Sequence, residues 1–279
     1  MCEFSENKSC LTAKFLPNLT NFSLWSQKSS SALACRIFQQ IQIMIKYNKI
    51  LIKLSGESLG NNGEFHLEKV QHILEEIAEL HNMGVQIGIV LGGGNFIRGS
   101  QLQQLGIPRQ VADDMGMLGT VINALLFQEL LLQLGQKAEI FTSREIQGIG
   151  QIYHYRNVEA SLQKKNILIF AAGTGHPYFT TDTGAALRAV EIGAECLFKA
   201  TKVDGVYNDD PKKNPNAVKF DTLTYNQVLT EKYKVMDLTA VSFCMENQLP
   251  ILVFDLVKPG NLLQAIQGEN VGTLIGDHF

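Results

Sequence analysis

Four segments of this chain place lysine, glycine, hydroxyl and carboxylate residues directly after short apolar runs. They cover residues 53–58, 92–98, 173–182 and 199–210. Each apolar run has the length of a buried strand, and ligands of open α/β sheets bind beyond the carboxyl ends of the strands. Phosphoryl transfer needs this mixture of groups. Cations and backbone amides offset charge on the transferring oxygens, while carboxylates hold Mg²⁺ or orient a lysine.

The first two segments carry the cationic candidates. Lys53 interrupts the apolar run at residues 50–54. A lysine in a buried strand is costly without a partner, so Lys53 is either an edge-strand residue in water or a group that reaches a phosphate. The glycine triplet at residues 92–94 lets backbone amides approach an anion closely, although a flexible turn is the alternative. The nearby Arg98 favours the anion-binding interpretation of the triplet, because a guanidinium group can bind phosphate bidentately.

Carboxylates and hydroxyls stand near two predicted helix starts. Thr180, Thr181 and Asp182 begin one helix, whose free amides can bind a phosphate, and Asp182 is a candidate partner for a lysine or for Mg²⁺. Asp113 and Asp114 stand near the start of another helix. They are either a solvated first turn favoured by the helix dipole, or one of them accepts hydrogen bonds from a sugar hydroxyl.

Other nucleotide and catalytic motifs are missing from the sequence. Ile97 stands where the dinucleotide fingerprint needs its last glycine, and the chain contains no G-x-x-x-x-G-K-[ST]. No Ser/His/Asp or Cys/His set competes, and the six histidines are scattered. The four segments together favour a nucleotide-dependent kinase over a passive nucleotide-binding protein.

Composition agrees with an ordinary globular domain. The 279 residues are 45% hydrophobic and 18% charged with a formal net charge of -3, which argues against a nucleic-acid-binding surface. Five cysteines without paired spacing indicate free thiols in a reducing cytosol. No apolar run approaches the roughly 18 residues that a membrane-spanning helix needs.

Strands and helices alternate from residue 44 onward, which predicts a three-layer αβα sandwich with a mostly parallel central sheet. Hydrophobic periodicity predicts helices at residues 67–82, 108–134, 156–163, 181–192, 238–247 and after 260, with Asp237 as the cap of the helix at 238–247. Residues 224–227 fit a capping box that opens a further short helix. Strands are predicted at residues 50–54, 86–91, 138–141, 167–172, 196–198, 251–254 and 273–275. The long apolar stripe within residues 108–134 is typical of a core or subunit-interface helix.

Residues 1–43 differ from the remainder, which we take as one domain, residues 44–279. They are rich in Ser, Asn, Gln and Lys and have little periodicity. We expect a disordered extension, or upstream sequence before a start at Met44. A targeting peptide is the alternative, and Glu3 and Glu6 argue mildly against it.

The combined motifs resemble a known family. Residues 53–57 (KLSGE), 92–95 (GGGN) and 199–207 (KATKVDGVY) resemble the amino-acid-kinase superfamily. Within it, three further motifs are similar to those of bacterial uridylate kinases, or UMP kinases. They are Asp113-x-Met115-Gly116, residues 174–182 and residues 234–237 (KVMD). The match runs in order from about Tyr47 to the end of the chain, and only the leader lies outside it.

The resemblance implies the reaction ATP + UMP → ADP + UDP with Mg²⁺. It also implies a cytoplasmic homohexamer in pyrimidine nucleotide synthesis, with feedback inhibition by UTP. Carried over by motif, the residues expected to bind ATP are Lys53, Leu54, Ser55, Gly56, Glu57, Ser58, Gly94, Arg98, Thr201, Tyr207 and Asp210. Those expected to bind UMP are Gly93, Asp113, Thr174, Gly175, His176, Pro177, Tyr178, Phe179, Thr180 and Thr181. Lys53 and Asp182 are the catalytic candidates, and no residue is assigned directly to a metal.

Two segments depart from the family pattern. His176 stands where the family commonly has Asn, which is either a tolerated exchange or a change in UMP contact or subunit communication. Residues 60–65 replace an acidic, Gly-rich segment that many relatives associate with activation by GTP, which argues against such activation here. Two other functions stay open. One is a kinase of the same superfamily with a carboxylate or carbamate acceptor, and the other is a non-catalytic nucleotide sensor.

Overall fold

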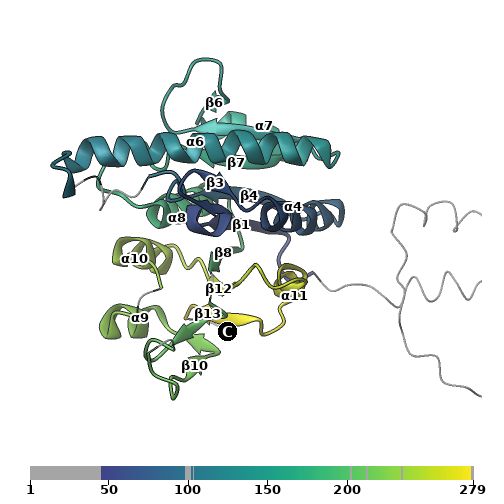
Figure 1. The fold of residues 1–279 in the computed structure, drawn as a ribbon. Coiled ribbons are helices and arrows are strands. Elements are labelled where there is room, and N and C mark those ends of the chain that lie inside the picture. Colours follow the sequence, from purple (N-terminus) through teal and green to yellow (C-terminus); the bar gives the residue numbers. More distant parts are fainter. Residues whose placement is uncertain are drawn as a thin grey trace, which may run out of the picture. The chain divides into compact units, whose positions relative to one another are not determined.

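The central sheet carries the loops that contain the candidate site residues. The computed structural model describes residues 45–97, 102, 104–201, 203–211, 213–233 and 235–277, so the predictions for residues 1–43 and for Arg98 lie outside the described residues. Within the described part, nine strands form the main sheet in the order β11-β13-β12-β8-β1-β4-β7-β5-β6 (Figure 1). All neighbours pair in parallel except β12 and β13. The predicted mostly parallel sheet is confirmed.

The strands follow the predicted order along the chain. Those of the main sheet are β1 (Lys49–Leu54), β4 (Gln86–Leu91), β5 (Ala138–Thr142), β6 (Gln151–Ile152), β7 (Ile167–Ala171), β8 (Cys196–Thr201), β11 (Thr222–Leu223), β12 (Ile251–Asp255) and β13 (Gly272–Ile275). In the described part of the chain, two small antiparallel pairs lie outside it, formed by β2 (Gly60–Asn61) with β3 (Glu64–Phe65) and by β9 (Val206–Tyr207) with β10 (Lys219–Phe220).

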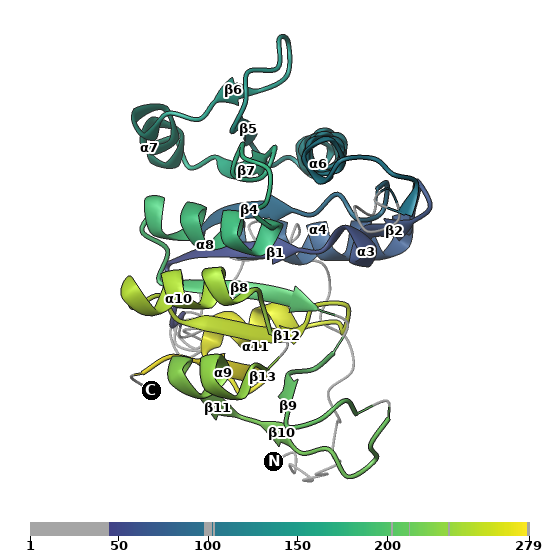
Figure 2. The same ribbon diagram turned by 90° about the vertical axis from the view of Figure 1, so that its left-hand side faces the viewer.

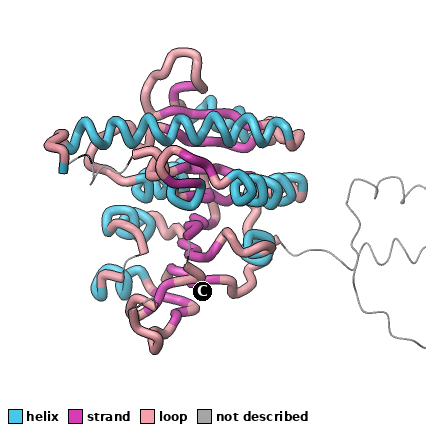
Figure 3. Tube along the Cα trace, in the orientation of Figure 1, coloured by secondary structure: helices cyan, strands magenta, loops and turns pink. Residues whose placement is uncertain are grey.

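Helices cover both faces of the main sheet, as Figure 2 shows. One face holds α3 (Gly56–Leu59), α4 (Leu67–Asn82), α6 (Arg109–Gln133) and α11 (Asn261–Gln267). The other holds α7 (Tyr155–Gln163), α8 (Thr181–Glu191), α9 (Tyr225–Glu231) and α10 (Leu238–Glu246). The alternation of helix and strand is visible along the tube in Figure 3. These layers confirm the predicted αβα sandwich.

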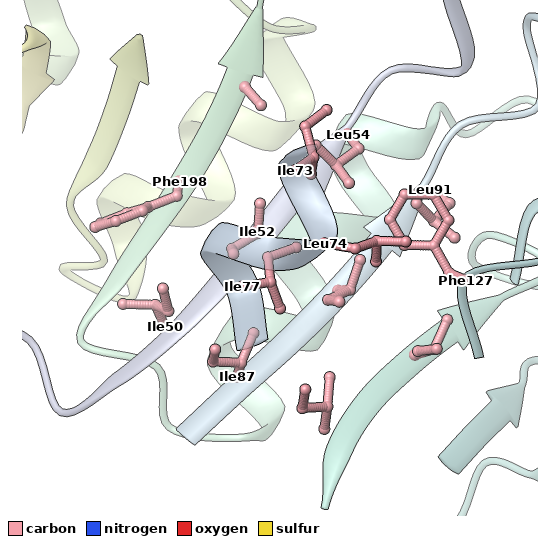
Figure 4. Close-up of a cluster of buried hydrophobic side chains, with 14 of the residues drawn as sticks. Ile50, Ile52, Leu54, Ile73, Leu74, Ile77, Ile87, Leu91, Phe127 and Phe198 are labelled. Atoms are coloured by element: carbon pink, nitrogen blue, oxygen red, sulfur yellow. The ribbon is translucent and has the colours of Figure 1, made fainter. Parts of the chain in front are cut away.

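Strand β1 is buried on both faces, as expected for a central strand of a parallel sheet. Ile50, Ile52 and Leu54 point into the cluster under α4, where Figure 4 shows them beside side chains of that helix. Leu51 belongs to the cluster on the opposite face. Because side chains alternate along a strand, Lys53 shares the face of Leu51, on which α8 packs.

Helix α6 has one buried and one exposed apolar face. Val121, Ala124, Phe127 and Leu131 are buried against the sheet. The exposed apolar residues of the helix include Val111, Leu118, Ile122, Leu125 and Leu132. By length and composition alone α6 could cross a membrane, which corrects the expectation that no such stretch exists. Its packing on the sheet supports the expected core helix.

Candidate active site

The register of the sheet brings the four predicted loops to one edge. Leu54, the last residue of β1, pairs with Leu91 of β4 on one side and Ala200 of β8 on the other. Val90 of β4 pairs with Phe170 of β7. The loops that follow β1, β4, β7 and β8 therefore leave the sheet side by side.

A carboxylate held between two buried lysines lies at this edge. Asp182 Oδ1 is 2.8 Å from the Nζ of Lys53, and Asp182 Oδ2 is 2.7 Å from the Nζ of Lys199. Lys53 and Lys199 are register partners on adjacent strands, and each is only 8% exposed. Lys199 also donates to the backbone carbonyl of Val235. This burial rules out the edge-strand alternative for Lys53 and makes Asp182 a partner of lysines.

The charges of this cluster stabilise one another. Burial on its own would raise the pKa of Asp182, but the charges of Lys53 and then Lys199 outweigh burial and hold that pKa below its usual value. Burial lowers the pKa of Lys199, and the neighbouring Asp182 carboxylate opposes that effect. When all three groups are ionised, the cluster keeps one positive charge in excess, which suits a phosphate ligand.

Glycines allow the first two loops to touch. A side chain at Gly56 would bring its Cβ within 2.4 Å of the backbone nitrogen of Gly94, and one at Gly93 would lie 2.4 Å from the carbonyl oxygen of Gly116. Asn95 and Asn123 fasten the second loop to α6 by mutual hydrogen bonds of 3.0 and 2.9 Å. Close packing therefore requires glycine at Gly93 of the triplet and at Gly56, and the flexible-turn alternative does not describe this loop.

A cleft of about 250 Å³ opens between the second and third loops and the start of α6. Seven of the residues expected to bind UMP line it, namely Gly93, Asp113, Thr174, His176, Phe179, Thr180 and Thr181. Gly175, Pro177 and Tyr178 are not among its lining residues. Arg109, Met117 and Thr120 also line the cleft and were not predicted.

Asp113 joins α6 to the third loop. Its Oδ2 accepts a 2.8 Å hydrogen bond from the backbone N–H of Tyr178 and lies 3.5 Å from the Nε of Arg109. The guanidinium of Arg109 also stacks over the Tyr178 ring, 5.0 Å from its centroid. Because α6 begins at Arg109, Asp113 and Asp114 lie in its second turn. The first-turn interpretation of these aspartates is therefore wrong.

The start of α8 is capped from two directions. The hydroxyl of Thr180 accepts hydrogen bonds from the backbone N–H groups of Asp182 and Thr183, at 3.0 and 3.3 Å. Thr180 and Thr183 in turn donate to the carboxylate of Asp237, which caps α10 through Ala240. The predicted helix start at Thr181 is confirmed.

Most of the residues expected to bind ATP lie at the ends of β1 and β8 or in the segments that follow them, and Gly94 lies in the loop after β4. Ser55 caps α3 by accepting a 3.2 Å hydrogen bond from the backbone N–H of Ser58. Thr201 ends β8 next to the site edge, and its hydroxyl donates to the carbonyl of Val203 at 2.6 Å. Tyr207 lies in β9 and donates to Asp204 Oδ1 at 2.7 Å, and this hydrogen bond raises the pKa of the phenol.

Sequence reasoning missed Lys199, which it placed in a polar loop. Strand β8 continues to Thr201, so Lys199 is a strand residue like Lys53. The same signal, a lysine in an apolar run, was present in both strands. Asp237 was predicted as a helix cap, which is confirmed, but its bonds to α8 could not be read from spacing.

Comparisons with known proteins agree with this geometry. The model of the amino acid kinase family matches residues 48–255. A uridylate kinase of Legionella pneumophila strain Lens is 46% identical over 242 residues, which are 86% of this chain and 98% of that protein. The relative from strain Paris is 45% identical over the same lengths.

Solved structures show the same fold. UMP kinase from Bacillus anthracis superposes with a TM-score of 0.81 at 35% identity, over 84% of this chain and 97% of that one. UMP kinase from Ureaplasma parvum gives 0.79 at 36% identity, over 84% and 100%. With the family model covering most of the chain and the lysine–aspartate–lysine cluster at the expected edge, this chain belongs to the amino acid kinase family.

Proposed function

We propose that this chain transfers the terminal phosphoryl group of ATP to UMP, giving ADP and UDP. The observation that carries this proposal is the Lys53–Asp182–Lys199 cluster, which lies at the same sheet edge as the cleft lined by Asp113 and Thr174. The names of the similar proteins, uridylate kinase and UMP kinase, support UMP as the acceptor.

The residues present suit a transfer that needs little proton chemistry. The attacking atom is a phosphate oxygen of UMP that is already anionic. It forms a bond to the γ-phosphorus of ATP as the bond from that phosphorus to the β-phosphate oxygen breaks. No strong general base is therefore required, and catalysis rests on positioning and charge neutralisation. Lys53 and Lys199 would offset charge on the transferring group, while Asp182 would keep both ammonium groups in place.

Mg²⁺ would enter with ATP. Among the described residues no group of three or more His, Cys, Asp or Glu side chains could hold a metal ion. The described residues therefore fit a magnesium ion that keeps several waters and is held mainly by substrate phosphates, as is usual for this ion. When bound, the ion would neutralise charge on the β- and γ-phosphates. On the protein side, Ser55 and Gly56 after β1 and Gly94 after β4, together with Thr201 and Tyr207, would bind ATP.

The wider setting follows from the same proposal. The enzyme would act in the cytoplasm as a homohexamer in pyrimidine nucleotide synthesis, with UTP as a feedback inhibitor. The exposed apolar residues of α6, among them Leu118 and Ile122, support assembly, because a contiguous apolar face on a long helix is typical of a subunit interface.

The decisive experiment measures ADP release by the purified protein with ATP and Mg²⁺. UMP, CMP, acetylglutamate, aspartate and carbamate are offered in parallel. Turnover with UMP alone is the expected result. Turnover with a carboxylate or carbamate instead would contradict the assigned acceptor, and ATP binding without any turnover would favour the nucleotide sensor.

A further inference from the structure

We infer that Arg144, paired with Asp114, is a positioning residue that holds the wall of the acceptor cleft at residues 173–178. The inference rests on the proposed function, because the cleft is taken to bind the acceptor nucleotide. Arg144 belongs to the loop between β5 and β6, and Asp114 stands at the variable position of the Asp113-x-Met115-Gly116 motif. Arg144 was not expected to act at the site, and Asp114 was considered only together with Asp113, as an acceptor for a sugar hydroxyl.

Arg144 bridges α6 and the third loop. Its terminal nitrogen lies 2.8 Å from Asp114 Oδ1, and its Nε donates a 2.7 Å hydrogen bond to the carbonyl oxygen of Gly175. One planar guanidinium therefore donates a hydrogen bond to Gly175 and forms an ion pair with Asp114 in a different direction, which a lysine ammonium cannot reproduce in the same geometry. The bridge fixes the position of Gly175 relative to the second turn of α6.

The neighbouring Ser143 secures the same wall. Its hydroxyl donates to the carbonyl of Gly173 at 2.6 Å and accepts from the buried Arg188 of α8 at 2.9 Å. A Cβ at Gly175 would come within 2.9 Å of the Ser143 carbonyl oxygen, so the two backbones are in close contact. Ser143 and Arg144 together hold both Gly173 and Gly175.

The wall depends on such contacts because its backbone is irregular. Gly173, Gly175 and Tyr178 have φ of +56°, +81° and +73°. A left-handed φ is costly for a tyrosine and persists only when the surroundings enforce it. Thr174 and His176, which flank Gly175, line the cleft. A displacement of Gly175 would therefore move two cleft residues at once.

Arg144 acts through the wall and not on the ligand. Arg109 lines the cleft, whereas Arg144 is absent from its lining. The Arg144 and Asp114 side chains are 42% and 38% exposed, so the pair is partly screened by water and its loss should have a moderate effect.

The kinetic test compares Arg144→Ala, Asp114→Ala and the double variant with wild type. We expect the KM for UMP to rise about three- to tenfold in each single variant, with kcat and the KM for ATP within about twofold of wild type. The double variant should be no worse than either single variant, because both remove one bridge. Arg156→Ala is the matched control, since the Arg156 guanidinium contacts the Tyr155 side chain and should leave every constant unchanged.

A second readout does not depend on the reaction. Amide hydrogen exchange of residues 173–178 in nucleotide-free protein should be faster in Arg144→Ala and Asp114→Ala than in wild type or Arg156→Ala. Should wild type fail to phosphorylate UMP, the proposed function falls and this exchange measurement still decides whether the bridge holds the wall. Unchanged exchange in both bridge variants would overturn the inference. A raised KM in Arg144→Ala alone would also overturn it, because it would indicate direct contact of Arg144 with the acceptor.

Discussion

At the scale of single residues, the site depends on the balance of charge around Asp182. The carboxylate is buried, and its two oxygens lie within 2.8 Å of two ammonium groups. Burying an isolated charge would cost several kcal/mol, so each member of the cluster needs the others. When all three groups are ionised, the cluster keeps one positive charge in excess, so the groups that stabilise the site also supply charge for binding phosphate.

Lys53 should be needed for turnover and not for folding. In Lys53→Ala, Asp182 keeps its bond to Lys199, so the domain should remain folded by circular dichroism. The loss of charge neutralisation should lower kcat for UMP phosphorylation by at least about 10³-fold. Lys49→Ala is the control, because Lys49 lies at the other end of β1 and donates to the Ile192 carbonyl. Near-normal activity of Lys53→Ala would refute its role.

The stability contributed by Asp182 should depend on pH. Its pKa is lower in the folded than in the unfolded chain, so its contribution is complete above the unfolded value of about 3.9 and is lost as the pH falls through the lower folded value. Asp182→Asn leaves two lysines without a counterion and should cost about 3–5 kcal/mol at pH 7. Urea unfolding should show this difference from wild type shrinking below about pH 4. An equal difference at pH 7 and pH 3 would contradict the assigned pKa.

At the scale of elements, the site is built where the backbones of loops approach each other so closely that there is no room for a side chain. The loop after β4 passes between the loop after β1 and the second and third turns of α6, with Gly93 against the backbone of Gly116. Close packing of this kind transmits any added volume directly to the backbone.

Two neighbouring glycines should therefore respond differently to alanine. Gly93→Ala would place a Cβ 2.4 Å from a backbone oxygen and should lower the free energy of unfolding by about 1–3 kcal/mol. Gly94→Ala meets its first neighbour, the Cγ of Glu57, at 3.6 Å and should change that free energy by less than about 0.5 kcal/mol. Urea unfolding of both variants checks the pair. Equal destabilisation would show that backbone freedom, and not space, selects glycine here.

Long periodic elements could be predicted from the sequence, and short ones could not. Helix α4 and strand β4 have the predicted bounds, because their apolar residues recur at a helical or a buried-strand spacing. The capping box at Thr224 is also present as predicted. Strands such as β2, β9 and β11 have two residues each, which is too few to show a period. They form because partner strands supply their hydrogen bonds, namely the adjacent β3 for β2, and β10 and β13 for β9 and β11.

At the scale of the whole molecule, the surface of α6 is the feature that the described domain leaves uncovered. Leu118, Ile122 and Leu125 are 56%, 48% and 40% exposed on one helix. Assembly through this face would remove apolar area from water at about 25 cal/mol per Å².

A charge on this face should weaken the proposed hexamer. Ile122→Glu is expected to reduce the mass observed by sedimentation equilibrium to that of smaller species, because burying an unpaired carboxylate at an interface is costly. Leu67→Glu, at an exposed leucine of α4, controls for the added charge. A hexamer in wild type that persists in Ile122→Glu would show that α6 is not the contact. A monomer in wild type would refute the assembly itself.

The sequence by itself determined the layers of the fold, the order of the principal strands and helices, and the four loops that carry lysine, glycine and carboxylates. These follow from local periodicity and from the rule that parallel strands end at one edge. Only the tertiary structure decided which groups meet. The pairing of Lys199 with Asp182, the bridge from Arg144 to Gly175 and the bonds of Asp237 to α8 join residues 17, 31 and 54 to 57 positions apart. Such contacts depend on strand register and loop packing, which leave no periodic trace in the chain.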